Sequence, residues 1–592
     1  MSGISTAKPV QSGAFLPMSR AEMEVLGWRE LDVLIITGDA YVDHPSFGAA
    51  MIGRVLESEG LRVGIVAQPD WRDADSLKVM GVPRLFVGVT AGNLDSMLSN
   101  YTAARHKRKL DVYSVGGVPG KRPNHAATVY SQMSRRAFPG VPVVLGGMEA
   151  SMRRVAHYDY WEDKLRPSVL TDSKAEVLVY GMGERAVREI ARRLRAGRGD
   201  LGGIPGTARL LGAKASAAAD FSGCIGLPSW EDLQGEVKLL LPLTRVTEAQ
   251  QTPFCGKRLV QMHGNRAVVV EPPAMPVDGP DLDALYEYPF QRAVHPSYHE
   301  PVPGFATIKD SVIVSRGCAG GCTFCGLGLH QGKFLSSRSV DSVLKEVRRL
   351  GELETFRGTV SDLGGPTANL FGARNGHVEA CRGCHRPSCL WPSPCPHFEI
   401  NERPGLELLR GARNLPGVKH VFVQSGIRMD VALRTPEYLR ELVQHHVSGH
   451  LKVAPEHLHP DVLRRMRKPA GDFPAFMQRF SELSAEAGKE QYLVPYFISS
   501  FPGCTEQKMG VVEEFLKQAR WNLQQVQDFI PLPMTAAAAM YVTGLDINSG
   551  MPIPVARKSR DREKQKNMLR PIPTPASQWL GGGVDPMDSQ VQ

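Results

Sequence analysis

Three cysteines with a short spacing carry the clearest chemical signal in this chain of 592 residues. Cys318, Cys322 and Cys325 lie in the run SRGCAGGCTFCGLG, directly after the apolar stretch SVIV. Three thiolates on one loop can bind an iron–sulfur cluster and leave one iron open to a substrate or cofactor. The alternatives are a structural zinc, which prefers four ligands, and chance. Glycines, which allow the backbone to approach an inorganic cluster closely, are Gly317, Gly320 and Gly321.

An aromatic residue, Phe324, directly precedes the third cysteine and could pack against a flat ligand. The pattern CxxxCxxC with an aromatic residue at this place resembles the signature of the radical SAM superfamily. In that superfamily, S-adenosylmethionine binds the open iron through its amino and carboxylate groups. The resemblance makes Phe324 a candidate cofactor-binding residue.

A second group of thiols follows in the run CRGCHRPSCLWPSPCPH. So many thiols among prolines and polar residues cannot all be buried core, so the run predicts a second metal site. Zinc and an auxiliary iron–sulfur cluster both remain open, and His385 and His397 are substitute ligands. The four cysteines are Cys381, Cys384, Cys389 and Cys395. The isolated cysteines, read as small core residues, are Cys224, Cys255 and Cys504.

A repeated strand and helix pattern must position the first cysteine loop. Six strand-like runs appear after Pro303, and the first five are each followed by helix-type sequence. Six parallel strands with crossover helices predict a partial (β/α)6 barrel of the TIM type, with its site at the carboxyl ends of the strands. We expect it to span 301–550, with the cysteine-rich insert at 376–400. The runs are SVIVSRG, GTVSDLGG, HVFVQSG, HLKVAPEH, YLVPYFISS and VQDFIPLP.

The chain before this barrel predicts a separate α/β domain. Residues 1–200 contain five strand-like runs with interspersed helical stretches, beginning with LDVLIITG and RVGIVAQP. This alternation indicates a doubly wound parallel sheet of the Rossmann-like type. Residues 201–300 predict a connecting β-rich segment with a hairpin at a Gly-Asn turn. Residues 551–592 are basic and rich in proline, and we expect a disordered tail.

Composition indicates a globular cytoplasmic protein. Of its residues, 42% are hydrophobic and 22% are charged, and no apolar run approaches the ~20 residues that cross a bilayer. We therefore expect no membrane partner. In a reducing compartment, clustered cysteines are better interpreted as metal ligands than as disulfides. The net charge of +9 favours an anionic partner such as nucleic acid. This support is weak, because much of the positive charge lies in the basic tail.

Several long motifs resemble the YgiQ family of uncharacterised radical SAM proteins. They are FLPMSRAEMEVLGW, GGMEASMRRVAHYDYWEDK, SKAEVLVYGMGERAV, the cysteine loop, KVAPEH and EQYLVPYFISSFPG. The resemblance implies a 4Fe-4S cluster on Cys318, Cys322 and Cys325. It also implies reductive cleavage of S-adenosylmethionine to a 5′-deoxyadenosyl radical that acts on an unknown substrate. It names no catalytic residue, and it calls for an electron donor such as flavodoxin or ferredoxin.

Other strand ends are similar to cofactor-binding positions of the superfamily. Gly364 and Gly365 resemble the glycine motif that contacts the methionine amino group, although Pro366 stands where an acidic residue usually follows. Charged side chains at the next strand ends are candidates for holding the methionine carboxylate and, through a glutamate, the ribose hydroxyls. Ordinary salt bridges at strand ends are the alternative. These candidates are Ser425, Arg428, Lys452 and Glu456.

The amino-terminal sheet is similar in architecture to cobalamin-binding domains that precede radical SAM barrels. Their lower-axial motif is Asp-x-His-x-x-Gly, whereas here Asp43 adjoins His44 and Gly48 lies four residues on, so the departure argues against cobalamin. Two functions from different classes remain. The first is a radical SAM enzyme. The second is an iron–sulfur electron-transfer or nucleic-acid-binding protein that does not cleave S-adenosylmethionine.

Overall fold

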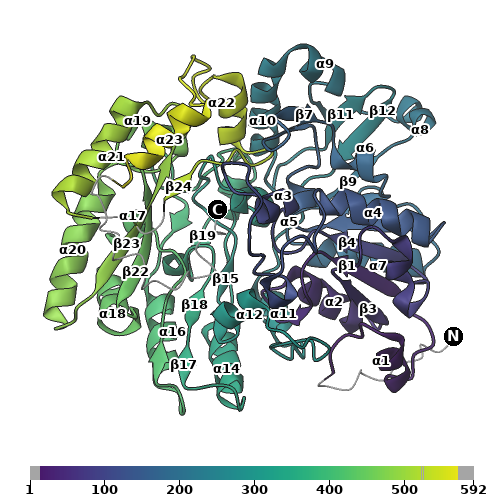
Figure 1. Cartoon of the computed structure of the whole chain (residues 1–592), viewed down its shortest axis with the longest axis horizontal. Helices are drawn as coiled ribbons and strands as arrows, with labels where there is room; N and C mark the ends of the chain where they lie inside the picture. The colour runs from purple at the N-terminus through teal and green to yellow at the C-terminus, as the bar shows by residue number, and fades with distance from the viewer. Residues whose placement is uncertain (1–13, 522, 524–525, 571–592) are drawn as a thin grey trace.

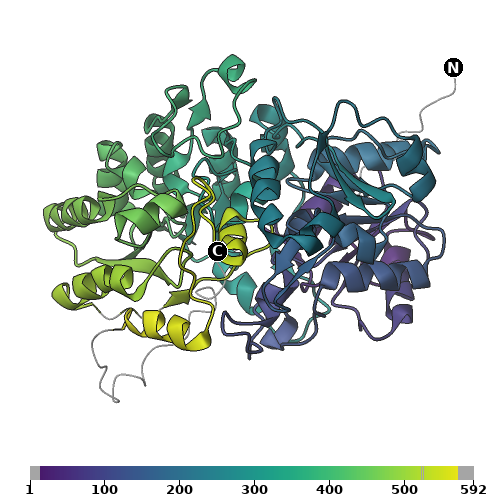
Figure 2. The same ribbon diagram turned by 90° about the horizontal axis from the view of Figure 1, so that it is seen from above.

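The computed structural model describes residues 14–521, 523 and 526–570. Two lobes lie side by side, an amino-terminal sheet with its helices and a carboxyl-terminal barrel (Figure 1). Seen from above, the last described helices lie against the barrel and near the junction of the lobes (Figure 2). The predicted fold class, a doubly wound sheet followed by a partial barrel, is confirmed.

A nine-stranded sheet in the order β10-β11-β12-β9-β8-β5-β4-β1-β3 forms the first lobe. Its parallel half has the strand order 2-1-3-4-5 along the sequence, so the order reverses between β1 and β4. The parallel strands are β1 (Val33–Thr37), β3 (Val63–Ala67), β4 (Phe86–Thr90), β5 (Val143–Gly146) and β8 (Val177–Val179).

Helices cover both faces of this sheet, which explains why its strands are apolar throughout. Successive side chains of a strand point to opposite faces. Leu34 and Ile36 pack in the core that includes α4 (Ala126–Ala137). The alternate residues of β1 pack in the core that includes α2 (Gly48–Ser58) and α7 (Glu184–Arg195).

The segment 201–300 extends the same sheet in antiparallel fashion. β9 (Thr207–Leu210) pairs with β8 and with β12 (Arg266–Val270), which forms a hairpin with β11 (Leu259–His263). Gly264 lies at the hairpin turn with φ of +61°. The predicted hairpin thus completes the sheet of the first lobe, and α10 (Leu240–Ala249) packs against the barrel helix α22 (Ala536–Thr543).

Six strand positions form the barrel. Parallel pairs join β14 to β18, β17 to β21, β22 to β23 and β23 to β24, and a parallel bridge from Ile427 to Val453 connects the third strand to the fourth. The strands are β14 (Ser311–Ile313), β17 (Thr359–Val360), β18 (Asp362–Gly364), β21 (His420–Val421), β22 (His450–Glu456), β23 (Tyr492–Ser499) and β24 (Gln527–Asp528). The helices after them are α14 (Val340–Gly351), α16 (Arg403–Arg413), α18 (Pro436–Glu441), α20 (Asp472–Glu486) and α21 (Glu506–Gln518).

Part of the expected disordered tail is ordered. Residues 551–570 include α23 (Ser559–Asn567), and Arg562 on this helix forms a 2.8 Å ion pair with Asp528 at the last barrel strand. Leu569 is fully buried. For these residues the expectation was wrong, because specific polar contacts dock this polar helix: Gln565 is buried with hydrogen bonds to Ser500 and Cys504, and Lys564 pairs with Glu506. The remaining part of the predicted tail, 571–592, lies outside the described residues.

Candidate iron–sulfur and cofactor site

The first cysteine loop begins at the carboxyl end of the first barrel strand. It follows β15 (Ser315–Arg316) and ends in α13 (Leu327–Gln331). The Cys318 N–H donates to the Gly332 carbonyl at 3.0 Å, and the Cys325 N–H donates to the Cys322 carbonyl at 3.2 Å. All three thiols are free and partly exposed. The structure therefore places them on one turn of chain at the mouth of the barrel.

Neighbouring chain segments leave no room for side chains at the loop glycines. Gly317 has φ of +84°, and a Cβ there would lie 2.1 Å from the Phe334 carbonyl oxygen. A Cβ at Gly321, where φ is +61°, would lie 2.5 Å from the Pro387 carbonyl oxygen. The glycines thus allow the loop to fold tightly, as the sequence predicted.

Burial raises the pKa of two thiols of the loop, Cys325 and Cys322. It raises the pKa of Cys325, and the neighbouring thiols Cys318 and Cys322 raise it further. Burial also raises the pKa of Cys322, while the charges of Lys468 and Arg428 act in the opposite direction. A metal centre releases thiol protons because it binds the thiolate form. In the described part of the chain, no three His, Cys, Asp or Glu side chains are arranged to hold a single ion.

Two cations and a carboxylate act on the pKa of the Cys322 thiol. Burial raises this pKa, the charges of Lys468 and Arg428 lower it, and the charge of Glu456 raises it. A Cβ at Gly320 would lie 2.7 Å from the Arg428 guanidinium. Lys468 forms a 3.2 Å ion pair with Glu456. The structure thus brings two predicted residues, Arg428 and Glu456, to the cysteine loop.

Lys468 is a site residue that sequence reasoning missed. It comes after α19 (Pro460–Met466), twelve residues beyond Glu456, and its ammonium group also donates to the Ala454 carbonyl. Lys468 does not follow a predicted strand, so the search of strand ends did not identify it. It reaches the barrel mouth because α19 turns the chain back toward the strand ends. The cavity beside it, about 150 Å³, is also lined by Arg428, Asp430 and Asp472.

Ser425 and the glycines of the second strand form a separate group. The Ser425 hydroxyl donates to the Asp362 carboxylate, which also accepts from the Ser425 N–H at 3.1 Å. A Cβ at Gly364 would lie 1.9 Å from the Ser425 hydroxyl oxygen, and one at Gly365 would lie 2.6 Å from the Ser315 hydroxyl oxygen. Burial raises the pKa of Asp362, while Ser425 and the charge of Lys452 act in the opposite direction. Asp362 therefore supplies an acidic group beside the glycine motif, although it precedes the motif in the chain.

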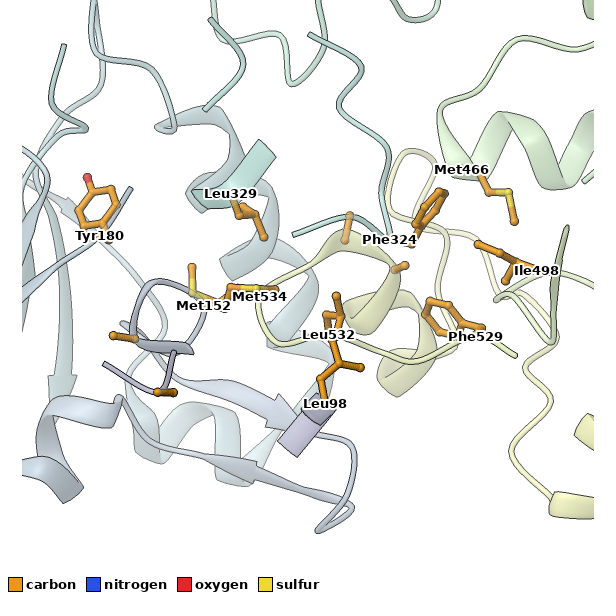
Figure 3. Packing of buried hydrophobic residues seen from close by; sticks show 14 of the residues in the cluster. Leu98, Met152, Tyr180, Phe324, Leu329, Met466, Ile498, Phe529, Leu532 and Met534 are labelled. Carbon is orange, nitrogen blue, oxygen red and sulfur yellow. The ribbon is translucent and has the colours of Figure 1, made fainter. Parts of the chain in front are cut away.

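Phe324 packs into the apolar core beneath the loop. Its side chain is 6% exposed and makes an edge contact with Phe501, with ring centroids 6.3 Å apart. Figure 3 shows Phe324 beside Met466, with Ile498 and Phe529 nearby. This placement gives Phe324 a packing role in the structure.

Side chains of the first lobe contact the cysteine loop. A Cβ at Gly326 would lie 2.9 Å from the Met152 sulfur. Arg467 forms two 2.9 Å hydrogen bonds with Glu248 on α10, and it donates to the Gly321 carbonyl at 3.5 Å. The mouth of the barrel is therefore covered by the first lobe.

The second cysteine loop packs directly on the first. The Cys389 N–H donates to the Ala319 carbonyl at 3.0 Å, and the Ser388 hydroxyl donates to the same oxygen at 3.1 Å. Burial raises the pKa of Cys381, and the other three thiols of this loop raise it further, so all four interact. The predicted insert thus lies above the barrel mouth.

Protein side chains fill the switch point of the first-lobe sheet, the place where a cobalamin would be expected. Ligands of such sheets bind where the strand order reverses, but Arg122 fills that place between β1 and β4 with a 2.7 Å ion pair to Asp39 and a 3.3 Å pair to Asp111. The cavity there is about 10 Å³. His44 is fully buried, and its Nδ1 accepts from the Ser46 N–H at 3.1 Å.

Comparisons with protein-family models agree with this organisation. The family model described as Radical SAM N-terminal matches residues 15–311, and the model described as Radical SAM superfamily matches 312–516. The boundary between the two matches falls at the first barrel strand. A radical SAM methyltransferase, TsrM from Kitasatospora setae, has a TM-score of 0.48 at 15% identity, over 91% of this chain and 82% of its own. The cobalamin-dependent radical enzyme OxsB has a TM-score of 0.46 at 11% identity, over 93% of this chain and 58% of its own.

Sequence relatives are much closer. A UPF0313 protein from Geobacter sulfurreducens is 48% identical over 94% of this chain and 92% of its own length. The UPF0313 protein YgiQ from Escherichia coli is 42% identical over 90% of this chain and 79% of its own length. The radical SAM superfamily uses a 4Fe-4S cluster and S-adenosylmethionine, and the protein is an enzyme of that superfamily. The chain belongs to the UPF0313 (YgiQ) family of radical SAM proteins.

Proposed function

We propose that Cys318, Cys322 and Cys325 bind the 4Fe-4S cluster and that this enzyme reductively cleaves S-adenosylmethionine. The observation that carries the proposal is that the Arg428 guanidinium lies against Gly320 of the cysteine loop and lines one cavity with Lys468, which pairs with Glu456. Three thiolates leave one iron open, and the surrounding charges suit a zwitterionic ligand. When bound, the cluster supplies the electron that opens the sulfonium and yields a 5′-deoxyadenosyl radical.

The chain's own residues position the cofactor. Arg428 and Lys468 are the cations for the methionine carboxylate, since charge-assisted hydrogen bonds are the strong ones. Asp430 orients the Arg428 guanidinium through two hydrogen bonds of 2.9 and 2.8 Å. Glu456 accepts from the ribose hydroxyls. Gly364 provides close backbone approach for the methionine amino group, and the Asp362 carboxylate beside it supplies negative charge.

Deoxyadenosine formation tests the proposal. The protein is reconstituted without oxygen, then given S-adenosylmethionine and dithionite, and 5′-deoxyadenosine is quantified. We expect product from the native protein and none from a variant in which Cys318, Cys322 and Cys325 are all alanine. Arg428→Ala should keep its iron but bind S-adenosylmethionine roughly 10- to 100-fold more weakly, as expected for losing a charged hydrogen bond. The exposed Arg440→Ala on α18 is the matched control.

The alternative function, an electron carrier or nucleic-acid-binding protein, predicts a different result. A fully clustered native protein would form no deoxyadenosine, and S-adenosylmethionine would leave its cluster spectrum unchanged. That pair of results would overturn the proposal. A carrier needs no open iron, and the structure supplies one loop with only three thiols.

Partners follow from the chemistry. An enzyme of this superfamily requires a substrate and a reductant, and we propose flavodoxin or ferredoxin as the class of electron donor. Within residues 14–521, 523 and 526–570, no helix is long and apolar enough to cross a membrane. We place the enzyme in the cytoplasm on the strength of its free thiols, which a reducing compartment preserves.

A further inference from the structure

The insert that carries the second set of cysteines has a defined base. β19 (Arg374–Asn375) pairs with β20 (Phe398–Glu399) in antiparallel register, and the Gly376 N–H donates to the His397 carbonyl at 2.9 Å. Both ends of the loop between them are therefore held together. This constraint confines four cysteines to one compact loop.

One tight turn and one longer closed loop bring these cysteines into pairs. The Cys384 N–H donates to the Cys381 carbonyl at 3.2 Å, and the Cys395 N–H donates to the Cys389 carbonyl at 2.7 Å. The tight turn repeats the arrangement of Cys322 and Cys325, whose hydrogen bond has the same length. Each loop thus presents a C-x-x-C pair on one closed turn.

The surroundings of the four thiols suit anionic sulfur. The Asn375 amide nitrogen lies 3.6 Å from the Cys389 sulfur as a donor. The Lys333 ammonium group donates to the Arg386 carbonyl at 2.6 Å and to the Cys384 carbonyl at 3.5 Å, so its positive charge lies against the loop. Cys381 and Cys389 are 7% and 6% exposed. Such donors and cations stabilise metal-bound thiolates and raise the reduction potential of a cluster.

A fifth cysteine, Cys255, joins this neighbourhood from the first lobe. Its thiol lies 3.7 Å from the Cys384 carbonyl oxygen and 3.9 Å from the His385 Nε2. His385 Nδ1 hydrogen-bonds the Ala249 carbonyl at 2.8 Å, at the end of α10. The loop is therefore fixed to the first lobe as well as to the barrel, and Cys255 has a positioning role there.

We propose that Cys381, Cys384, Cys389 and Cys395 bind a second iron–sulfur cluster that the protein ligates fully. A single zinc would need all four sulfurs on one ion at about 2.3 Å, and no such convergence exists among the described residues. The first-loop cysteines are not gathered around one ion either, and this chain belongs to a superfamily that uses a 4Fe-4S cluster. In such a cluster each thiolate binds a different iron, so the four sulfurs need not meet at one point.

This second centre goes beyond the proposed cleavage reaction. With four thiolates it has no open iron, so it exchanges electrons and does not bind a substrate. Its loop contacts the first loop through the hydrogen bond from Cys389 to Ala319. The two clusters therefore lie on adjoining loops at the junction of the lobes.

Iron and zinc content with electron paramagnetic resonance tests the assignment. The full chain is reconstituted anaerobically with iron and sulfide, and iron, labile sulfide and zinc are counted per chain. At about four irons per cluster, we expect about eight in the native protein. We expect about four in the triple alanine variant of the first loop and about four in Cys384→Ser/Cys389→Ser. The first-loop variant should lack one of the two paramagnetic resonance signals of the native protein. S-adenosylmethionine should alter that signal and leave the other unchanged.

Two results would overturn the second cluster. One is native iron content in Cys384→Ser/Cys389→Ser. The other is one zinc per chain that this variant loses. Cys224→Ala, outside both loops, should match the native protein. A signal sensitive to S-adenosylmethionine in Cys384→Ser/Cys389→Ser shows that this variant has folded, and Cys384→Ser alone provides a milder change if it has not. Loss of deoxyadenosine formation with eight irons retained would contradict only the proposed cleavage.

Discussion

The cysteine loop depends on glycine at position 317. Gly317→Ala would place a Cβ 2.1 Å from the Phe334 carbonyl oxygen and force an alanine to φ of +84°. Such backbone strain costs about 1–3 kcal/mol, and the neighbouring atom is rigid backbone. We expect this variant to retain roughly half or less of the iron of the first cluster and to melt several degrees lower, measured by iron analysis and calorimetry.

Gly328→Ala is its matched control. Gly328 lies in α13, eleven residues on, with open space around its Cβ position. Alanine is favoured over glycine inside a helix by about 1 kcal/mol, so this variant should keep its iron and melt at the same or a higher temperature. Equal iron in the two variants would contradict the need for a bare backbone at 317.

Cysteine spacing predicted the loop residues, and strand-end position predicted Arg428 and Glu456. Lys468 and Asp362 escaped prediction for physical reasons. Lys468 reaches the site because α19 folds back, which depends on tertiary packing. Asp362 precedes its glycine motif, whereas the superfamily pattern directs attention to the residue after it.

At the scale of elements, a buried side-chain hydrogen bond connects the segments that follow β22 and β23, in addition to the backbone hydrogen bonds between these strands. His457, directly after β22, has its Nε2 3.4 Å from the Cys504 sulfur, which follows β23. Burial, together with the nearby His459 and Lys508, lowers the pKa of His457 to about 3. The folded protein therefore holds this imidazole neutral.

This predicts a loss of stability in mild acid. In the unfolded chain His457 takes up a proton below its ordinary pKa of 6.5, so the unfolded state gains protons first. The free energy of unfolding contributed by His457 is fully present above pH 6.5. It falls by up to about 1.4 kcal/mol per pH unit as pH drops toward 3. Urea unfolding of the native protein and His457→Gln from pH 8 to 5 measures this contribution. We expect the free energy of unfolding to depend less steeply on pH in His457→Gln than in the native protein. The exposed His420→Gln is the control, and an equally steep dependence in both variants would contradict the role of His457.

The elements themselves were largely readable from sequence. Apolar periodicity predicted all six barrel strands. Fully buried strands such as β1 can be recognised in the sequence by an uninterrupted run of apolar residues. The joining of β9 to β8 was not predicted, because antiparallel pairing across 201–300 depends on which sheet edge is free. The docking of α23 depends on the ion pairs of Arg562 and Lys564 and on the buried Gln565, and a charge count does not distinguish such a helix from a solvated tail.

At the scale of the whole molecule, the two lobes hold the cysteine loop between them. Arg467 and Glu248 pair across the junction, with side chains that are 4% and 16% exposed. On the other side of the loop, the Ser151 hydroxyl lies 3.0 Å from His330 Nδ1, and Arg316 pairs with Glu184 at 2.5 Å. Stability of the cluster site is therefore a property of the assembled lobes.

Glu248→Gln tests this coupling. It leaves the buried Arg467 without its ionic partner, and breaking a buried pair costs up to about 3–5 kcal/mol. Because Arg467 also donates to the Gly321 carbonyl, we expect faster loss of iron on exposure to air as well as a lower melting temperature. Glu482→Gln, which breaks the exposed pair with Arg479, should cost less than about 1 kcal/mol and leave iron loss unchanged. If both variants lost iron at the native rate, the junction would serve only to attach the lobes, and the cluster loop would depend on the barrel alone.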